Sequence, residues 1–148
     1  MTANCATSNR PFLGFAAITV AAILLFPAQS LPAEAQRRVT AYYFHTTIRC
    51  STCLLIEERA GEVLGEAFAG EIGGGLLQWQ PVNLQVPENR HYFTEMRVRP
   101  KSLTLVEYYG EVATEKKELP GVWKLIHGER SAFRRYLVDE VRLFLAAP

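Results

Sequence analysis

The sequence predicts an α/β domain in the order β-α-β-α-β-β-α, with a central four-stranded mixed sheet flanked by helices. Three observations support this fold class. Short runs of β-branched and aromatic residues alternate with longer segments in which apolar residues recur at helical spacing. Two of the expected strands flank a Tyr-Gly turn, which is typical of an antiparallel hairpin. The chain has 148 residues, 49% of them hydrophobic and 21% charged, which is enough for one domain with a sizeable core.

The first 35 residues read as a targeting segment, either a signal peptide or an N-terminal membrane anchor. Arg10 precedes an uncharged apolar run over residues 12–26. That run has the length of a signal-peptide core and is short for a membrane span. Residues 33–35, Ala-Glu-Ala, offer a small-x-small cleavage site before Gln36.

We therefore expect an exported protein, periplasmic or otherwise extracytoplasmic, with residues 36–148 as a folded domain. If the segment is not cleaved, residues 12–26 would tether that domain to a membrane. Cleavage would remove Cys5 and leave Cys50 and Cys53 as the two cysteines of the mature chain. In an oxidising compartment these two can pair with each other or with another molecule.

The first strand is expected over residues 39–45, "VTAYYFH", whose continuous apolar character predicts burial on both faces. A helix is expected directly after Cys50, with Ser51 or Thr52 capping its first turn. Three glycines at 73–75 end it. The apolar positions at helical spacing in this segment are Ile56, Ala60, Val63, Leu64, Ala67 and Phe68.

The second strand is expected over residues 76–84, parallel to the first through a right-handed crossover. Pro81 within it predicts a bulge or an edge position, because proline cannot donate to the ladder. Residues 86–98 then predict a short helix with Pro87 near its first turn. Its expected apolar side carries Tyr92, Phe93 and Met96.

A hairpin and a final helix complete the domain. The two strands are expected over Leu103–Tyr108 and roughly Glu111–Lys116. The last helix is expected over residues 131–145, with Ser131 as its N-cap. Its predicted buried face carries Phe133, Leu137, Val141 and Phe144.

The motif that carries chemistry is Cys50-Ser51-Thr52-Cys53 at the junction between the first strand and its helix. Unpaired backbone N–H groups and the positive end of the helix dipole meet Cys50 there, and both favour its thiolate. Cys53, one turn into the helix, is expected to lie deeper. There it could attack a mixed disulfide formed on Cys50 and release the partner as a thiol.

Charged neighbours act on this pair in opposite directions. Arg49 would lower the pKa of Cys50, whereas Glu57 and Glu58 would raise it if they lie close, and the sign of the balance stays open. His45 ends the strand just before the motif. A charged imidazole there would favour the thiolate and shuttle its proton, and the alternative is a surface histidine at a strand end.

Two other uses of the pair compete with redox chemistry. A closed zinc site takes four ligands, and Cys50 and Cys53 supply two, while His45, His91 and His127 are spread over separate elements. Soft Cu(I) or arsenite needs fewer ligands and could bind the same two thiolates. An inert structural disulfide is less favoured, because so short a loop constrains little unfolded chain. A net charge of +1 gives no indication of nucleic-acid binding.

The element order, with Cys-x-x-Cys at the first strand-to-helix junction, resembles the thioredoxin superfamily over residues 39–146. Closer still, "VTAYYFHTTIRCSTCLLIEE", "PVNLQVPENRHY", "KSLTLV" and the "W…FRRYLVDEV" ending resemble the nitrophenyl compound nitroreductase subunit ArsF family, whose members are small thioredoxin-like proteins. The resemblance implies a dithiol in which Cys50 attacks and Cys53 resolves. The residues do not support the nitroreductase activity of the family label, because the chain has no phosphate-cradling glycine loop or other flavin-site signature.

The chain departs from thioredoxins at positions around the motif. Arg49 stands where they have tryptophan, and Ser51-Thr52 replaces Gly-Pro. Phe44 stands where they bury an aspartate that accepts the proton of the second cysteine, which leaves His45 as the nearest substitute. Ser102 aligns with their cis-proline. A non-proline cis bond costs roughly 2.5 to 4 kcal/mol, so we expect a trans peptide before Ser102.

Taken together, these features predict an exported thiol–disulfide oxidoreductase without a bound cofactor. Its partner would be a protein or a small molecule that carries a thiol or a disulfide. The alternatives from other classes are a module that binds Cu(I) or arsenite through Cys50 and Cys53, and a thioredoxin-like scaffold with idle cysteines.

Overall fold

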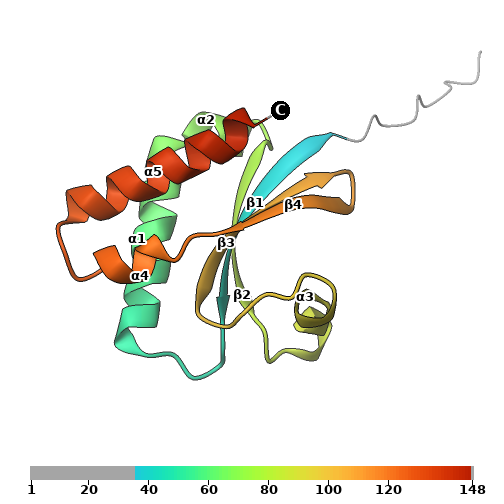
Figure 1. The fold of residues 1–148 in the computed structure, drawn as a ribbon, viewed down its shortest axis with the longest axis horizontal. Helices are drawn as coiled ribbons and strands as arrows, with labels where there is room; N and C mark the ends of the chain where they lie inside the picture. Colours follow the sequence, from blue (N-terminus) through green and yellow to red (C-terminus); the bar gives the residue numbers. More distant parts are fainter. Residues whose placement is uncertain (1–35, 148) are drawn as a thin grey trace, which may run out of the picture. The chain divides into compact units, whose positions relative to one another are not determined.

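A computed structural model describes residues 36–147 and confirms the predicted α/β fold class with a four-stranded mixed sheet (Figure 1). The predicted order of the main elements is also confirmed, with short helices added. The elements are β1 (Arg37–His45), α1 (Ser51–Ala67), α2 (Ala69–Gly73), β2 (Leu77–Asn83), η1 (Pro87–Asn89), α3 (Arg90–Thr94), β3 (Ser102–Tyr109), β4 (Val112–Glu118), α4 (Gly121–Leu125) and α5 (Arg130–Ala146).

The sheet has the order β2-β1-β3-β4. Strand β1 pairs in parallel with β2 and antiparallel with β3, and β4 is antiparallel to β3. Residues 39–44 of β1 are all buried, as expected for a central strand whose two faces are both covered. Strand β2 lies at one edge, which confirms the edge position predicted from Pro81. We call this arrangement, with the cysteine pair at the start of α1, thioredoxin-like.

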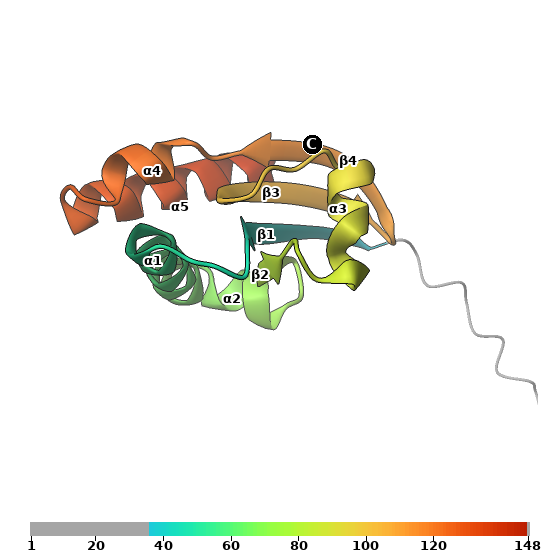
Figure 2. The same ribbon diagram turned by 90° about the horizontal axis from the view of Figure 1, so that it is seen from below.

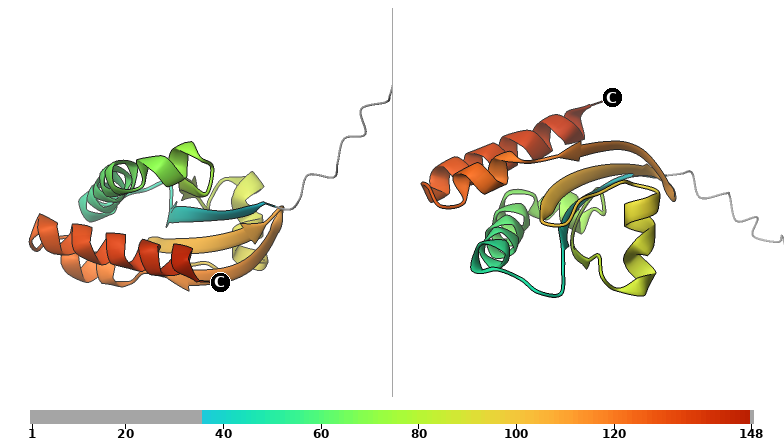
Figure 3. Two further views of the ribbon diagram at one scale, coloured as in Figure 1. Left: turned by 90° about the horizontal axis from the view of Figure 1, so that it is seen from above. Right: turned by 60° about the horizontal axis from the view of Figure 1, so that its bottom comes forward.

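Helices cover the two faces of the sheet unequally. Helices α1, α4 and α5 lie on one face, and the short helix α3 lies on the other (Figures 2 and 3). The larger core fills the first layer, with Ile56 and Leu64 of α1 and Phe133 and Leu137 of α5 packed against the sheet. The smaller core under α3 is rich in aromatic side chains. Its members are Tyr42, Phe44, Val82, Leu84, Tyr92, Val98, Val106 and Tyr108.

Two local predictions differ from the structure, and one short helix was missed. Helix α5 begins after Glu129, which has an extended backbone and makes no side-chain cap bond, so Ser131 is not the N-cap. In α3, Tyr92 is buried but Phe93 is 40% exposed, because consecutive residues of an α-helix point about 100° apart and only one of the two faces the sheet. Helix α4 was not predicted, since its five residues span little more than one turn.

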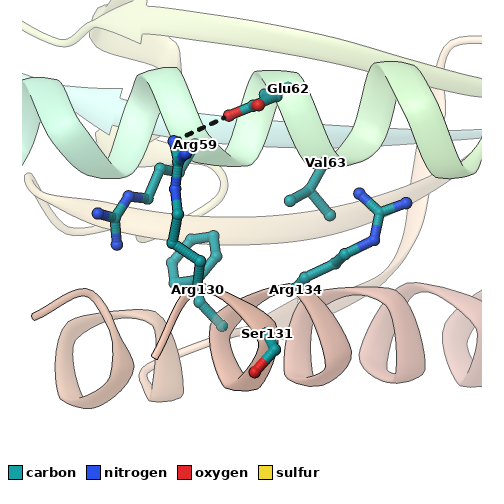
Figure 4. A pocket seen from close by; sticks show the side chains of 7 residues that line it. Arg59, Glu62, Val63, Arg130, Ser131 and Arg134 are labelled. Atoms are coloured by element: carbon teal, nitrogen blue, oxygen red, sulfur yellow. Dashed lines mark hydrogen bonds and ion pairs between the residues drawn. The ribbon is translucent and has the colours of Figure 1, made fainter. Parts of the chain in front are cut away.

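Helices α1 and α5 are also joined by charged side chains across a hollow of about 170 Å³ (Figure 4). Arg130 pairs with Glu62 at 3.4 Å, and Arg134 pairs with Glu66 at 2.7 Å. These groups are exposed, and exposed ion pairs contribute about 0 to 1 kcal/mol each. The two helices are therefore held together mainly by their apolar faces. The arginine–glutamate pairs lie at the exposed edge of that contact and add little stability.

The predicted targeting run over residues 12–26 and the cleavage site at residues 33–35 lie outside the described residues. Between residues 36 and 147, no helix is both long and apolar enough to cross a membrane.

Candidate functional site

The two cysteines form a disulfide at the start of α1, with Cα atoms 5.1 Å apart. Cys50 is the N-cap of the helix, with φ −80° and ψ 161°, and its Sγ accepts a hydrogen bond of 3.2 Å from the backbone N–H of Cys53. The prediction that Ser51 or Thr52 caps α1 is therefore wrong, because both residues lie inside the first turn. The sulfur itself occupies the position at which a helix N-terminus stabilises negative charge.

The two sulfurs differ sharply in exposure. Cys50 lies on the surface, whereas Cys53 is 2% exposed and packs among the buried residues of α1. A partner can therefore reach the Cys50 sulfur from solvent, while Cys53 is reached through Cys50. This is the geometry that sequential thiol–disulfide exchange requires.

Arg49 links three parts of the site. Its Nη2 forms an ion pair of 2.5 Å with Glu57 Oε2, and its Nε donates a hydrogen bond of 3.1 Å to His45 Nδ1. The positive charge next to Cys50 is thus offset by a carboxylate on α1. Glu58, the other candidate neighbour, is exposed to solvent. The structure brings Glu57 to the site and leaves Glu58 outside it.

His45, expected from the sequence to assist the cysteines as a charged imidazole, accepts a hydrogen bond from Arg49. A ring nitrogen that accepts a hydrogen bond uses its lone pair, so the contact with Arg49 occupies Nδ1 of His45. The same Nδ1 lies 3.1 Å from the backbone oxygen of Thr46. The guanidinium of Arg49 lies between His45 and Glu57.

Tyr43 of β1 was not singled out from the sequence, although it lies beside these charges. Its side chain is fully buried, and its Oη has no hydrogen-bond partner. Burial raises the pKa of Tyr43 to about 12, and the negative charge of Glu57 adds to the effect while Arg49 opposes it. The alternation of side chains along β1 was the available signal, since it places Tyr43 on the face opposite Phe44 and toward α1.

Of the two residues between the cysteines, Thr52 contacts the connection between α4 and α5. Thr52 Oγ1 lies 3.3 Å from Nε2 of His127, which is exposed. Ser51 is exposed at the first position of α1. His127 was considered in the sequence only as an isolated histidine, because nothing in its own segment points to Thr52.

Ser102 begins β3 beside the end of β1, where it pairs with Phe44. It is buried, and its hydroxyl donates a hydrogen bond of 2.7 Å to the backbone oxygen of Arg99. The peptide bond before it is trans, as expected, and Lys101 has a left-handed φ of 62°. Trp123 Nε1 donates a hydrogen bond of 2.8 Å to the Lys101 carbonyl oxygen, which anchors this turn to α4.

The described residues contain no cluster of three or more histidine, cysteine, aspartate or glutamate side chains that could hold a metal ion. His45 and His127 each make a contact at the site, whereas His91 lies on α3, with Nδ1 2.8 Å from the Glu88 carbonyl oxygen. The cysteine pair therefore offers two sulfurs and no third ligand among residues 36–147.

No family model and no curated protein matches the chain. Among solved structures, it is similar to thioredoxin O2 from Arabidopsis thaliana in the oxidized state, with 17% identity, a TM-score of 0.41 and coverage of 66% of this chain and 74% of that one. It is also similar to human ERp44 in a zinc-bound form, with 19% identity, a TM-score of 0.46 and coverage of 74% and 28%. A second structure of human ERp44 gives 13% identity, a TM-score of 0.44 and coverage of 78% and 29%. These are similarities of fold, and they carry no statement about activity.

Proposed function

We propose that the protein is a thiol–disulfide oxidoreductase that works through the Cys50–Cys53 pair without a bound cofactor. One observation carries the proposal. An exposed sulfur caps a helix of 17 residues, and a second sulfur lies buried one turn further on, within bonding reach of the first. The N–H of Cys53 and the helix dipole both favour a thiolate at Cys50 in the reduced protein.

The exchange would run in two steps. The Cys50 thiolate attacks a disulfide of the partner, forms a mixed disulfide and displaces one partner sulfur as a thiolate. Cys53 then attacks the Cys50 sulfur, closes the intramolecular disulfide and displaces the second partner sulfur. The partner gains two electrons and two protons, and the Cys50–Cys53 pair loses them. The opposite direction uses the same steps in reverse.

The surface around Cys50 supports a protein partner over a small polar thiol. Ile48 is 87% exposed in the loop that leads to Cys50, and Leu54 is 48% exposed directly after Cys53. These two apolar side chains flank the pair in the sequence. A partner with apolar surface beside its cysteine would bury both, and burial of an exposed aliphatic side chain contributes about 1.5 to 3 kcal/mol.

Export and the closer family are part of the proposal and rest on the sequence. The apolar run over residues 12–26 supports export, and a cysteine pair suits an oxidising compartment. The resemblance to the nitrophenyl compound nitroreductase subunit ArsF family rests on residues 39–58, 81–92 and 101–106 and on the ending with Trp123 and residues 133–141. The nitroreductase chemistry of that label does not enter the proposal.

Substitution of each cysteine tests the function. Cys53→Ser should keep the first step and accumulate a mixed disulfide on Cys50, whereas Cys50→Ser should abolish exchange and trap no partner. Mass spectrometry after incubation with a disulfide-containing peptide separates the two outcomes. Exchange that survives in Cys50→Ser would refute the proposal. Arsenite binding that is lost in both variants, together with no exchange in the wild type, would favour the metalloid-binding module instead.

A further inference from the structure

The second step of the exchange needs a proton acceptor close to Cys53. A thiol attacks a disulfide as its thiolate, so the proton of Cys53 must leave before or during the attack. Cys53 is 2% exposed, which keeps its thiol away from bulk water. A protein group beside Cys53 is therefore needed as the acceptor. This inference rests on the proposed function and names the residue that performs this part of it.

Glu57 lies in the position that this role requires. It follows Cys53 by four residues on α1, and side chains at that spacing are neighbours on one helix face, with Cβ atoms about 5 to 6 Å apart. Ala60 and Leu64 continue the same face into the core, and both are fully buried. The Glu57 Oε2 atom is shielded from solvent, although the residue as a whole is only partly buried. Glu57 therefore lies on the helix face that carries Cys53, one turn further along α1.

Arg49 holds that carboxylate in place. Its ion pair with Glu57 joins the loop before Cys50 to the second turn of α1, and its hydrogen bond to His45 fixes the guanidinium from the side of β1. The Glu57 side chain is 23% exposed, and the guanidinium paired with it fixes the direction in which its carboxylate points. Arg49 is a positioning residue in this arrangement, because it acts on Cys53 through Glu57.

The other titratable groups around Glu57 are less suited to accept the proton. Tyr43, on β1, has a pKa raised to about 12, so it stays a neutral phenol at physiological pH and is not a base for a thiol proton. His45 has its Nδ1 lone pair engaged by Arg49. His127, from the α4–α5 connection, is exposed and contacts Thr52, which lies at the outer end of the helix.

We propose that Glu57 accepts the proton of the Cys53 thiol in the resolving step, with Arg49 positioning its carboxylate. The Cys53 S–H bond breaks, and the proton passes to the Glu57 carboxylate. The Cys53 thiolate forms a bond to Cys50 Sγ, and the bond between Cys50 Sγ and the partner sulfur breaks. The partner sulfur leaves with the electron pair. In the reverse direction, protonated Glu57 returns the proton to Cys53 as that sulfur leaves.

Stopped-flow oxidation of the reduced protein by dithiobis(nitrobenzoate) separates the two steps. Attack by Cys50 releases one coloured nitrothiobenzoate at a rate that depends on reagent concentration. Attack by Cys53 releases the second at a rate that does not. In Glu57→Gln we expect the second release to slow about a hundredfold at neutral pH, since a positioned general base contributes at least that factor. The first release should change less than about threefold, and Glu57→Asp should recover part of the loss.

The pH profile distinguishes a lost base from a disturbed structure. In Glu57→Gln the second release should rise about tenfold per pH unit, because solvent hydroxide must then take the proton, whereas the wild type should respond less steeply. Glu58→Gln is the matched control, with the same chemical change on the exposed neighbour, and should behave as the wild type. Arg49→Gln breaks the ion pair but keeps the carboxylate, so its second release should exceed that of Glu57→Gln.

Two results would overturn different parts of the account. A second release in Glu57→Gln within about threefold of the wild type, with an unchanged pH profile, would exclude Glu57 as the proton acceptor and leave the redox function intact. The absence of any second release in the wild type would refute the redox function itself. If Glu57→Gln does not fold, Glu57→Asp decides: its second release should be slower than that of the wild type with an unchanged first release, and a wild-type second release would exclude Glu57 as the proton acceptor.

Discussion

The identity of the α1 N-cap gives a prediction that links stability to chemistry. Cys50→Ser and Cys50→Ala both abolish the disulfide, and they differ in one respect. Serine can still accept the N–H of Cys53 that Cys50 Sγ accepts at 3.2 Å, and alanine cannot. Serine at an N-cap stabilises a helix by typically about 1 kcal/mol relative to alanine. We expect Cys50→Ala to be less stable than Cys50→Ser by that amount.

The disulfide contributes a second, separable amount. The two cysteines are three positions apart, and for the closed loop of about four residues the chain-entropy relation gives about 2 kcal/mol at room temperature. Cys50→Ser should therefore be about 2 kcal/mol, and Cys50→Ala about 3 kcal/mol, less stable than the oxidised wild type. Both estimates exceed the usual effect of a surface substitution, which is within about 0.5 kcal/mol.

Urea unfolding followed by far-UV circular dichroism measures both amounts. With a slope of about 1 to 3 kcal/mol per molar, the midpoints of the two Cys50 variants should differ by roughly 0.3 to 1 M. Ser51→Ala is the control, since Ser51 is exposed and lies after the cap, and it should stay close to the wild type. A Cys50→Ala variant as stable as Cys50→Ser would show that the hydrogen bond accepted by residue 50 adds no stability and that residue 50 does not cap α1.

Two further predictions concern groups away from the cysteines. Arg37 pairs with the buried side chain of Glu107 and donates three hydrogen bonds to carbonyls at the end of α5, so Arg37→Ala should lose about 3 to 5 kcal/mol in urea unfolding. Arg99→Ala, which removes an exposed pair with Glu118, should lose less than about 1 kcal/mol, and equal losses would contradict this ranking. Tyr43 has a pKa raised from 10.0 to about 12, so the folded protein keeps a proton that the unfolded chain releases first. Its contribution to stability is complete below pH 10 and is lost as the pH rises toward about 12; Tyr43→Phe should reduce that fall, and an identical pH dependence would count against it.

Elements with a strong local pattern could be predicted from the sequence, and their ends could not. The uninterrupted apolar run predicts a strand in β1, and the helical spacing of apolar residues predicts helices in α1 and α5. The spacing in α1 and α5 would leave apolar side chains exposed to solvent if those segments were strands. The cap of α1 was misassigned because serine and threonine are the usual cap residues. Which side chain reaches the free N–H groups depends on where the loop from β1 turns, and that is set by tertiary contacts.

In the candidate site too, the positions set by one helix could be predicted from the sequence, and the contacts between elements could not. Cys50 and Cys53 followed from a motif at a strand-to-helix junction, since the positions of both residues are set by the helix itself. The position of Glu57 relative to Cys53 was also available from helical spacing. Its pairing with Arg49 was not, because Arg49 lies in a loop whose path no local rule predicts. The unpartnered hydroxyl of Tyr43 likewise results from packing across layers.

Redox activity of the cysteine pair can be measured directly from the equilibrium of the Cys50–Cys53 couple with glutathione buffers, together with the pKa of Cys50 from thiolate absorbance or alkylation rates. The account predicts a reversible two-electron couple and a Cys50 pKa below the ordinary thiol value of about 8.5, because the sulfur caps α1 and accepts a backbone N–H. A pair locked in one redox state, with an ordinary Cys50 pKa, would contradict a redox function and leave the cysteines as metalloid ligands or an idle part of the scaffold.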